Sequence, residues 1–246
     1  MKELLKVIQK RQSLRGPFDP KRPVAKHDLM QVLEAGRWTP TAHNMQNFEI
    51  IVVDDKKLLQ AIGKIRSPIS ETFIRENYQQ LSFSEEELRR KKVGILGTMF
   101  PPAFRTPGFK LDKADIEQMG SRFGSLIQTS PVLLIVLYDP RRRAPASEGD
   151  FLGIISLGCL MENMWLMASS LGIGFHILSS ISAEPVEKEV KRILNIPKHL
   201  MIAYAVRMGY PASALAAASK PAKPLRVRRD IPDFTHHNRF GNMGIE

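Results

Sequence analysis

The sequence predicts a globular protein that combines α-helices with β-strands around one substantial core. Hydrophobic residues make up 43% of the 246 residues, which is ordinary for a packed domain. Residues 131–138 form a continuous apolar run of strand length, and residues 151–171 form an apolar run long enough for a central helix. A core strand and a core helix are therefore expected close together in the sequence.

The first quarter of the chain alternates helical and strand patterns. Residues 2–12 and 26–35 carry apolar side chains at helical spacing, so two helices are expected there. Residues 48–53 are rich in β-branched side chains and end at two aspartates, which predicts a strand. Residues 56–63 then predict a third helix that ends at a glycine.

Residues 64–124 are expected to form an excursion over the core, because their periodicity is weak. The excursion includes a charged helical patch at 85–92 and a proline-rich, aromatic loop at 100–109. Long loops in compact domains are often functional lids. A lid over a flat cofactor and a packed structural loop are equally compatible with this composition.

The second half is expected to continue the core. The run at 131–138 predicts a central strand covered on both faces, because its apolar residues do not alternate with polar ones. Residues 172–180 read as a helix end that turns into an extended segment. The remaining predicted elements are a helix at 184–194, a strand at 201–208 and an extended arm at 211–224.

The apolar stretch at 151–174 is long enough to span a bilayer, but Glu162 and Asn163 lie at its middle. A charge there is costly in lipid, so a buried core helix is the better interpretation. No secretory signal is visible at the N-terminus, which favours the cytoplasm. The single cysteine, Cys159, excludes a disulfide framework and a multi-cysteine metal site within one subunit.

The chain is strongly basic, with 36 lysines and arginines against 25 acidic residues and a net charge of +11. This balance suggests an anionic partner: nucleic acid, an acidic membrane face or a phosphorylated cofactor. The basic clusters are short and scattered, and neither a zinc-finger spacing nor an aromatic ribonucleoprotein motif occurs. Nucleic-acid binding is therefore supported by charge alone, and the sequence does not predict it. The scattered histidines predict no metal site.

The best candidate for an anion site lies near the N-terminus. Arg11 and Arg15 bracket Ser13, and two guanidinium groups with a hydroxyl can all donate to one phosphate. About thirty residues later, the segment at 40–48 is dense in short polar side chains that suit the edge of a heterocycle.

These two segments resemble motifs of the nitroreductase family. The chain reads Arg-Gln-Ser-Leu-Arg-Gly-Pro-Phe at 11–18, where the family has Arg-Arg-Ser-x-Arg-x-Phe. It keeps the proline, asparagine, glutamine and aromatic residue of the family's second motif at 39–48, although Asn47 replaces the second proline. Leu-Gly-Ile-Gly at 171–174 also matches, so the resemblance covers nearly the whole chain.

The resemblance implies an α+β fold with a mixed, mainly antiparallel sheet flanked by helices. It implies a single FMN-binding domain over 1–246, with the excursion at 64–124. It also implies a C-terminal arm at 211–246 that is exchanged between the subunits of a homodimer, with the FMN sites at the subunit interface.

Residues carried over from the family give the expected FMN site. The first motif would contact the phosphate or ribityl chain and the pyrimidine edge from one side of the cofactor, and the C-terminal segment would supply a second phosphate clamp from the other side. The neighbouring subunit would supply the second motif, and backbone N–H groups at a serine pair would address the flavin N5 and O4. These residues are Arg11, Gln12, Ser13, Arg15, Pro40, Thr41, Ala42, Asn44, Gln46, Ser179, Ser180, Arg226 and Arg228.

Each of these residues also has a structural interpretation. An arginine alone is most often a surface charge, Asn44 could simply end a helix, and Gln46 could simply be exposed. The serine pair departs from the Glu-Gly or Gly-Gly of many family members. Rossmann, zinc-protease, Walker and Gly-x-Ser-x-Gly motifs do not occur in the sequence.

The implied activity is hydride transfer from NAD(P)H through FMN to a nitroaromatic, a quinone or a similar electron-poor small molecule, in a ping-pong scheme. No catalytic side chain is expected, because the flavin supplies the chemistry. The same fold also hosts reductive dehalogenation and flavin cleavage, and these tasks stay open. The non-enzymatic alternative is a basic protein that binds flavin or nucleic acid.

Overall fold

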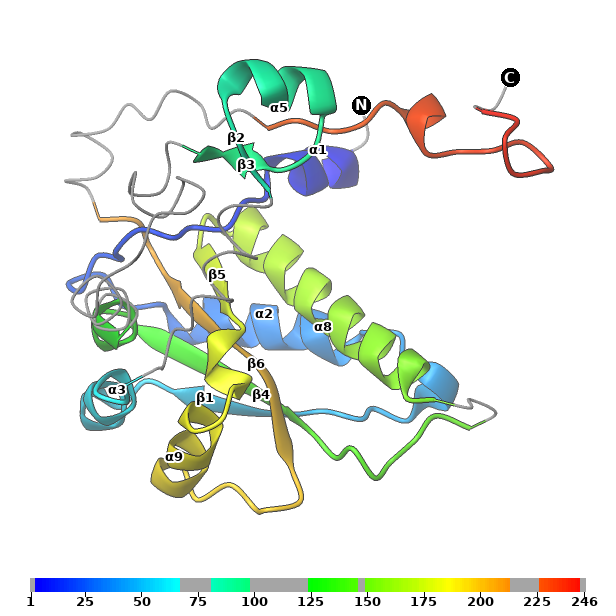
Figure 1. The fold of residues 1–246 in the computed structure, drawn as a ribbon. Coiled ribbons are helices and arrows are strands. Elements are labelled where there is room, and N and C mark those ends of the chain that lie inside the picture. The colour runs from blue at the N-terminus through cyan, green and yellow to red at the C-terminus, as the bar shows by residue number, and fades with distance from the viewer. Residues whose placement is uncertain (1–2, 67–80, 98–123, 146–148, 213–225, 244–246) are drawn as a thin grey trace. The chain divides into compact units, whose positions relative to one another are not determined.

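The computed structural model describes residues 3–66, 81–97, 124–145, 149–212 and 226–243 (Figure 1). The chain divides into two compact units, which are described separately: Met1–Ser67 with Gly120–Ala218, and Pro68–Met119 with Ser219–Glu246. The expected single domain over 1–246 stays a prediction. The expected loop at 100–109 and most of the arm at 211–224 lie outside the described residues.

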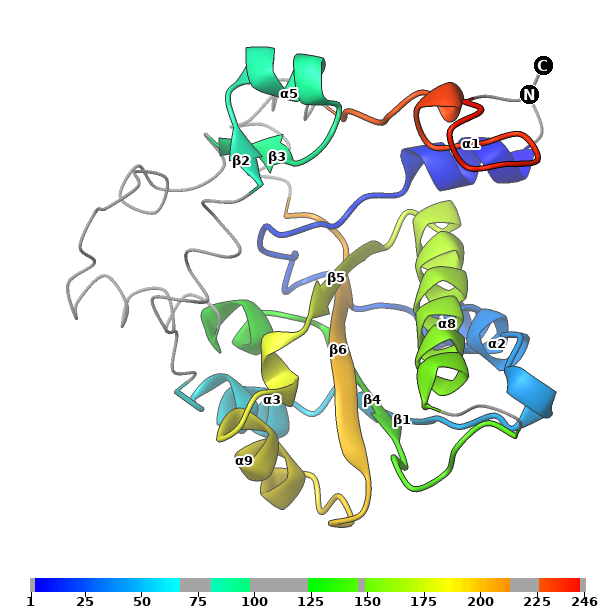
Figure 2. The same ribbon diagram turned by 45° about the vertical axis from the view of Figure 1, so that its right-hand side comes forward.

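The first unit is built on a four-stranded antiparallel sheet (Figure 2). Its strands, in spatial order, are β1 (Glu49–Val53), β4 (Val132–Tyr138), β6 (Met201–Gly209) and β5 (Gly174–Leu178). In the middle of the sheet, Ile135 of β4 lies opposite Ile51 of β1 on one side and Ala205 of β6 on the other. The expected mainly antiparallel sheet is confirmed.

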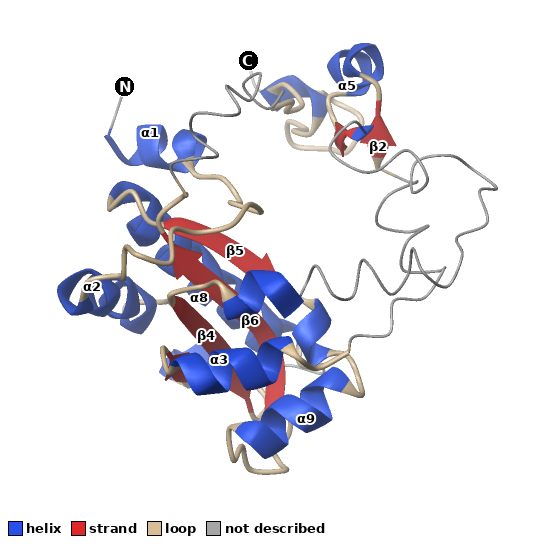
Figure 3. Cartoon of the chain, turned by 90° about the vertical axis from the view of Figure 1, so that its left-hand side faces the viewer, coloured by secondary structure: helices blue, strands red, loops and turns tan. Residues whose placement is uncertain are grey.

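Helices cover both faces of this sheet. The helices α2 (Lys26–Arg37) and α8 (Phe151–Ser170) lie on one face, and α3 (Lys56–Gly63) and α9 (Val186–Ile193) lie on the other (Figure 3). Alternate residues of β4 enter two separate cores, because successive side chains of a strand point to opposite faces. The predicted strand covered on both faces is therefore confirmed.

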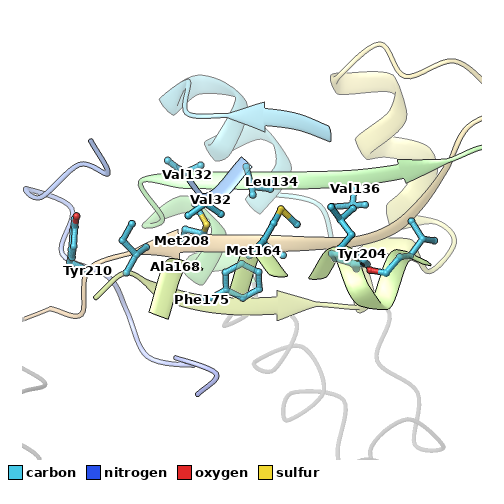
Figure 4. Close-up of a cluster of buried hydrophobic side chains, with 14 residues drawn as sticks. Val32, Val132, Leu134, Val136, Met164, Ala168, Phe175, Tyr204, Met208 and Tyr210 are labelled. Carbon is cyan, nitrogen blue, oxygen red and sulfur yellow. Dashed lines mark hydrogen bonds between the residues drawn. The ribbon is translucent and has the colours of Figure 1, made fainter. Parts of the chain in front are cut away.

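The core between the sheet and the helices α2 and α8 contains Val132, Leu134 and Val136 of β4 together with Met164 of α8 (Figure 4). The core against α3 and α9 contains the intervening residues of β4. Near-complete burial of each such side chain stabilises the fold by about 1.5–3 kcal/mol.

The helices and strands begin and end close to the predicted positions. The N-terminal helix, α1, spans Glu3–Lys10, two residues short of its expected end. The helix α3 begins after Asp55, whose carboxylate accepts a hydrogen bond from the backbone N–H of Leu58 at 2.9 Å. This N-cap satisfies one of the first backbone donors, which have no partner within the helix.

The expectation that residues 151–174 form a buried helix is correct for only one side of α8. Leu160 and Met164 are fully buried, whereas Phe151 is 70% exposed and Ile154 is 59% exposed. By length and composition alone α8 could cross a membrane, but its buried side packs on the sheet. Only one side of the helix can lie on the sheet, although its sequence is apolar on both sides.

The second unit contains α5 (Glu85–Lys91), β2 (Ser82–Phe83) and β3 (Ile95–Leu96), with the two short strands parallel. A capping box begins α5: Ser84 Oγ accepts from the N–H of Glu87, and the Glu87 carboxylate accepts from the N–H of Ser84. The predicted charged helix at 85–92 is confirmed.

The C-terminal segment of the second unit pairs with the residue that follows α5. Lys92 adopts a left-handed conformation with φ 54° and forms ion pairs with Asp230 and Asp233. Asp230 is the N-cap of the short 3-10 helix η5 (Ile231–Asp233), and Asp233 is its last residue. The ion pairs fasten residues 230–233 to the 81–97 segment of the same unit.

Candidate functional site

The predicted anion-binding segment lies along the edge strand β5. Ser13 forms a parallel β-bridge with Phe175, and the backbone N–H of Leu14 donates to the Phe175 carbonyl at 3.0 Å. Phe18 forms an antiparallel bridge with Pro211, just beyond the end of β6. Residues 13–18 therefore extend the sheet, and the backbone of the predicted Arg11–Arg15 clamp is held in place.

Two glycines make room for this segment. A Cβ atom at Gly174 would lie 2.5 Å from Leu14 Cδ2 and 2.7 Å from Phe18 Cε1. A Cβ atom at Gly209 would lie 2.7 Å from Phe18 Cγ. Side chains at these positions would displace the segment, so the second glycine of the Leu-Gly-Ile-Gly motif has a steric role here.

Arg11 is fixed against α8. Its Nε donates to Glu162 Oε1 at 2.6 Å, and its guanidinium carbon lies 4.7 Å from the centre of the Trp165 ring. Trp165 in turn stacks on Phe175 at 5.5 Å and donates through Nε1 to the carbonyl of Gln12 at 3.3 Å. Sequence reasoning did not foresee the carboxylate partner of Arg11.

Arg207 of β6 is a buried cation next to the same segment, and sequence reasoning missed it. Its Nε donates to His176 Nδ1 at 2.8 Å, and its Nη2 donates to the carbonyls of Leu14 (3.2 Å) and Gly16. It has no exposed surface. The signal in the sequence was a single arginine near the end of an otherwise apolar strand.

Burial sets the protonation of this pair. Burial, then the charges of Arg207 and Arg15, lower the pKa of His176 to about 3. Burial also lowers the pKa of Arg207, to about 10. At pH 7 His176 is therefore neutral and accepts at Nδ1, while Arg207 keeps its positive charge.

The second motif folds into a compact turn around the 3-10 helix η1 (Ala42–Asn44). The backbone N–H of Gln46 donates to Thr41 Oγ1 at 3.1 Å, and the Gln46 amide donates to Asn44 Oδ1 at 3.2 Å. His43, Asn44 and Gln46 have φ values of 50°, 53° and 43°. Left-handed conformations are uncommon outside glycine, although Asn and His adopt them more readily than most residues, and they often mark functional sites.

The two motifs contact different turns of α8. The backbone N–H of Ala42 lies 3.4 Å from Ser156 Oγ, whereas Arg11 reaches Glu162. Six residues separate these two positions, which is about 9 Å along the helix axis. Pro40, which precedes the turn, is exposed. The expectation that Asn44 serves the site of the neighbouring subunit stays a prediction.

The predicted serine pair follows β5 directly. Ser179 is exposed, and its carbonyl accepts from the backbone N–H and the hydroxyl of Ser182, at 3.1 and 2.7 Å. Ser180 begins the 3-10 helix η4 (Ser180–Ser182). Because Phe175 of β5 also bridges to Ser13, one strand connects the first motif to the serine pair.

The remaining predicted residues, Arg226 and Arg228, belong to the second unit. Both are exposed, and Arg228 Nη1 donates to the neighbouring Val227 carbonyl at 2.7 Å. Their expected role as a second phosphate clamp stays a prediction.

Comparisons with known proteins agree with the motifs. The sequence model described as "Nitroreductase family" matches residues 8–210. An NADPH-dependent oxidoreductase from Staphylococcus aureus (strain USA300) is 22% identical over 219 residues, which are 89% of this chain and 67% of that protein.

Solved structures show the same fold. An FMN-dependent nitroreductase from Clostridium difficile R20291 superposes with a TM-score of 0.56 at 16% identity, covering 96% of this chain and 99% of that one. An iodotyrosine deiodinase bound to FMN and 3-iodo-L-tyrosine gives a TM-score of 0.61 at 22% identity, covering 96% and 100%. At these identities the likeness concerns the fold.

Proposed function

Because the chain belongs to the nitroreductase family over residues 8–210, we propose that it binds FMN and transfers hydride from NAD(P)H to an electron-poor acceptor. Family membership makes the chain an oxidoreductase, as the sequence predicted. The acceptor class that we propose is a nitroaromatic, a quinone or a similar small molecule. Bound FMN would accept the hydride and pass it on, and the protein would supply binding and orientation.

The first motif on the edge of β5 is the observation that carries this proposal. Ser13 is held there by its bridge to Phe175, with Arg11 and Arg15 on either side. The buried cation Arg207 contacts the same segment, and its partners are three carbonyls and a neutral imidazole. This concentration of positive charge and hydrogen-bond donors suits a phosphate group.

The residues of this chain would then bind and orient the cofactor. The first motif would hold the phosphate end of the cofactor. The backbone N–H groups at Ser179 and Ser180 would address the flavin ring, since they follow the same strand. Arg226 and Arg228 would close the phosphate site from the C-terminal segment. No side chain is assigned a proton-transfer role.

We propose a homodimer that buries the exposed side of α8. Phe151, Leu152, Ile154 and Ile155 are 39–70% exposed along its first two turns. Contiguous exposed apolar side chains of this size are typical of an interaction surface. In such a dimer, the turn that contains Asn44 would contribute to the FMN site of the other subunit. We also propose a cytoplasmic location.

The absorbance spectrum of the purified protein tests the proposal directly. We expect a flavin spectrum that bleaches when NADH or NADPH is added and recovers when a quinone or nitroaromatic acceptor is supplied. A colourless protein that does not bind added FMN would refute the proposed cofactor. NAD(P)H oxidation whose rate does not depend on such acceptors would instead favour another flavin task, such as dehalogenation.

A further inference from the structure

We propose that Arg207 is a positioning residue for the phosphate end of the flavin site. Its buried guanidinium fixes the turn at residues 14–16 and places a positive charge behind Arg15. This inference rests on the proposed FMN site. Arg207 itself contacts only protein groups among the described residues, so it would influence the ligand by fixing the position of residues 14–16.

The contacts of Arg207 surround Arg15. Its Nη2 donates to the carbonyls of Leu14 and Gly16, which are the residues immediately before and after Arg15. The Phe18 ring lies 4.4 Å from the guanidinium carbon and covers it on one side. The backbone of Arg15 is therefore held on both sides by one fully buried group.

The same guanidinium joins three parts of the chain. Arg207 lies directly opposite His176 in the pairing of β6 with β5, which brings Nε to His176 Nδ1. Its Nη1 donates to the Leu126 carbonyl at 3.3 Å, within the helical turn at 124–128. A planar fork of five N–H donors can serve these acceptors together, whereas a lysine ammonium could not reach all of them.

The charge of Arg207 is poorly compensated by the groups it contacts. Those described partners are carbonyl oxygens and an imidazole that is neutral at pH 7, and none is a carboxylate. A buried charge is costly without an opposite charge nearby. A phosphate bound to the Arg11–Arg15 segment would supply that opposite charge. The bound cofactor would therefore stabilise the buried guanidinium of Arg207 and the turn that it holds.

The preference for FMN over riboflavin measures this effect, because riboflavin lacks only the phosphate. We would determine both dissociation constants by fluorescence quenching for the wild type, Arg207→Met and Arg207→Lys. We expect Arg207→Met to reduce the FMN preference by about tenfold or more, the equivalent of one charged hydrogen bond. Arg207→Lys should give a smaller loss, because it keeps the charge but not the fork.

Val206→Ala is the matched control. Val206 is the neighbouring residue of β6, is equally buried and enters the core on the opposite face of the sheet. Its truncation should lower stability and weaken both flavins to a similar extent. The ratio of the two affinities should therefore stay at the wild-type value.

Two variants of His176 extend the test if Arg207→Met does not fold. His176→Leu removes the acceptor for Arg207 Nε, so we expect it to lower the FMN preference. His176→Gln keeps an acceptor on the side chain and should restore much of that preference. A general packing role for His176 would instead affect both flavins equally.

The possible outcomes separate this inference from the proposed function. A wild-type protein that binds neither flavin would overturn the proposed function and this inference with it. A wild type that prefers FMN, combined with Arg207 variants that keep the full preference, would overturn only the role of Arg207. An equal loss of preference in Val206→Ala would also overturn that role.

Discussion

Replacing Arg11 with alanine tests the first motif most directly. We expect Arg11→Ala to be purified with little flavin, because the guanidinium is assigned to the phosphate end of FMN. A hydrogen bond to a charged group contributes about 1.5–3 kcal/mol, so the FMN dissociation constant should rise by about tenfold to a hundredfold.

The structure predicts a much smaller effect on folding. The side chains of Arg11 and Glu162 are 27% and 34% exposed, so their ion pair is accessible to water. Pairs of that kind contribute about 0.2–1 kcal/mol to stability. The loss of flavin affinity should therefore clearly exceed the loss of stability of the flavin-free protein, measured by urea unfolding.

Glu162→Gln is the control for the ion pair. This variant removes the carboxylate charge that lies 2.6 Å from Arg11 Nε but leaves the guanidinium in place. Without the competing anion, FMN should bind as tightly as in the wild type or about two- to fivefold more tightly, the equivalent of about 0.5–1 kcal/mol. FMN titrations followed by fluorescence quenching measure both variants.

Two results would refute this reasoning. A wild-type dissociation constant in Arg11→Ala would remove Arg11 from the phosphate site. An equal loss of affinity in Glu162→Gln and Arg11→Ala would mean that Arg11 acts only through its ion pair with α8.

Three further predictions follow from the packing and the protonation of the first unit. Gly174→Ala should lower stability by about 1–3 kcal/mol and weaken FMN binding, because its Cβ would clash with Leu14. Thermal unfolding measures this loss, and an unchanged melting temperature in Gly174→Ala would contradict the steric argument. The pKa of His176 is lowered to about 3 in the folded protein, from its ordinary value of 6.5. At pH values between these two, the unfolded chain therefore binds more protons than the folded chain does. Stability should thus fall by about 2 kcal/mol from pH 7 to pH 5. Urea titrations should show a smaller fall in His176→Gln, and an identical fall would exclude His176 as the cause. Met164→Ala should cost about 2–5 kcal/mol in urea unfolding, because Met164 is fully buried against the sheet, and a cost under 1 kcal/mol would contradict that packing.

Local patterns in the sequence were sufficient for most elements of the first unit. The apolar run at 131–138 predicted a strand covered on both faces, and β4 is covered on both faces. A third helix was predicted over 56–63 with its end at the glycine, and α3 has these limits. Hydrogen bonds at helix ends and side-chain periodicity depend on residues a few positions apart, so they can be predicted from the sequence.

The sequence by itself also determined the family, because the motif at 11–18 keeps the order and spacing of its cations. Only the tertiary structure decided what lies around that motif. It placed Arg11 on Glu162, Arg207 opposite His176, and the exposed side of α8 away from the sheet. The contact of Arg207 with His176 joins residues 31 positions apart, and the contact of Arg11 with Glu162 joins residues 151 positions apart. Strand register and helix packing set them, and no local pattern encodes either one.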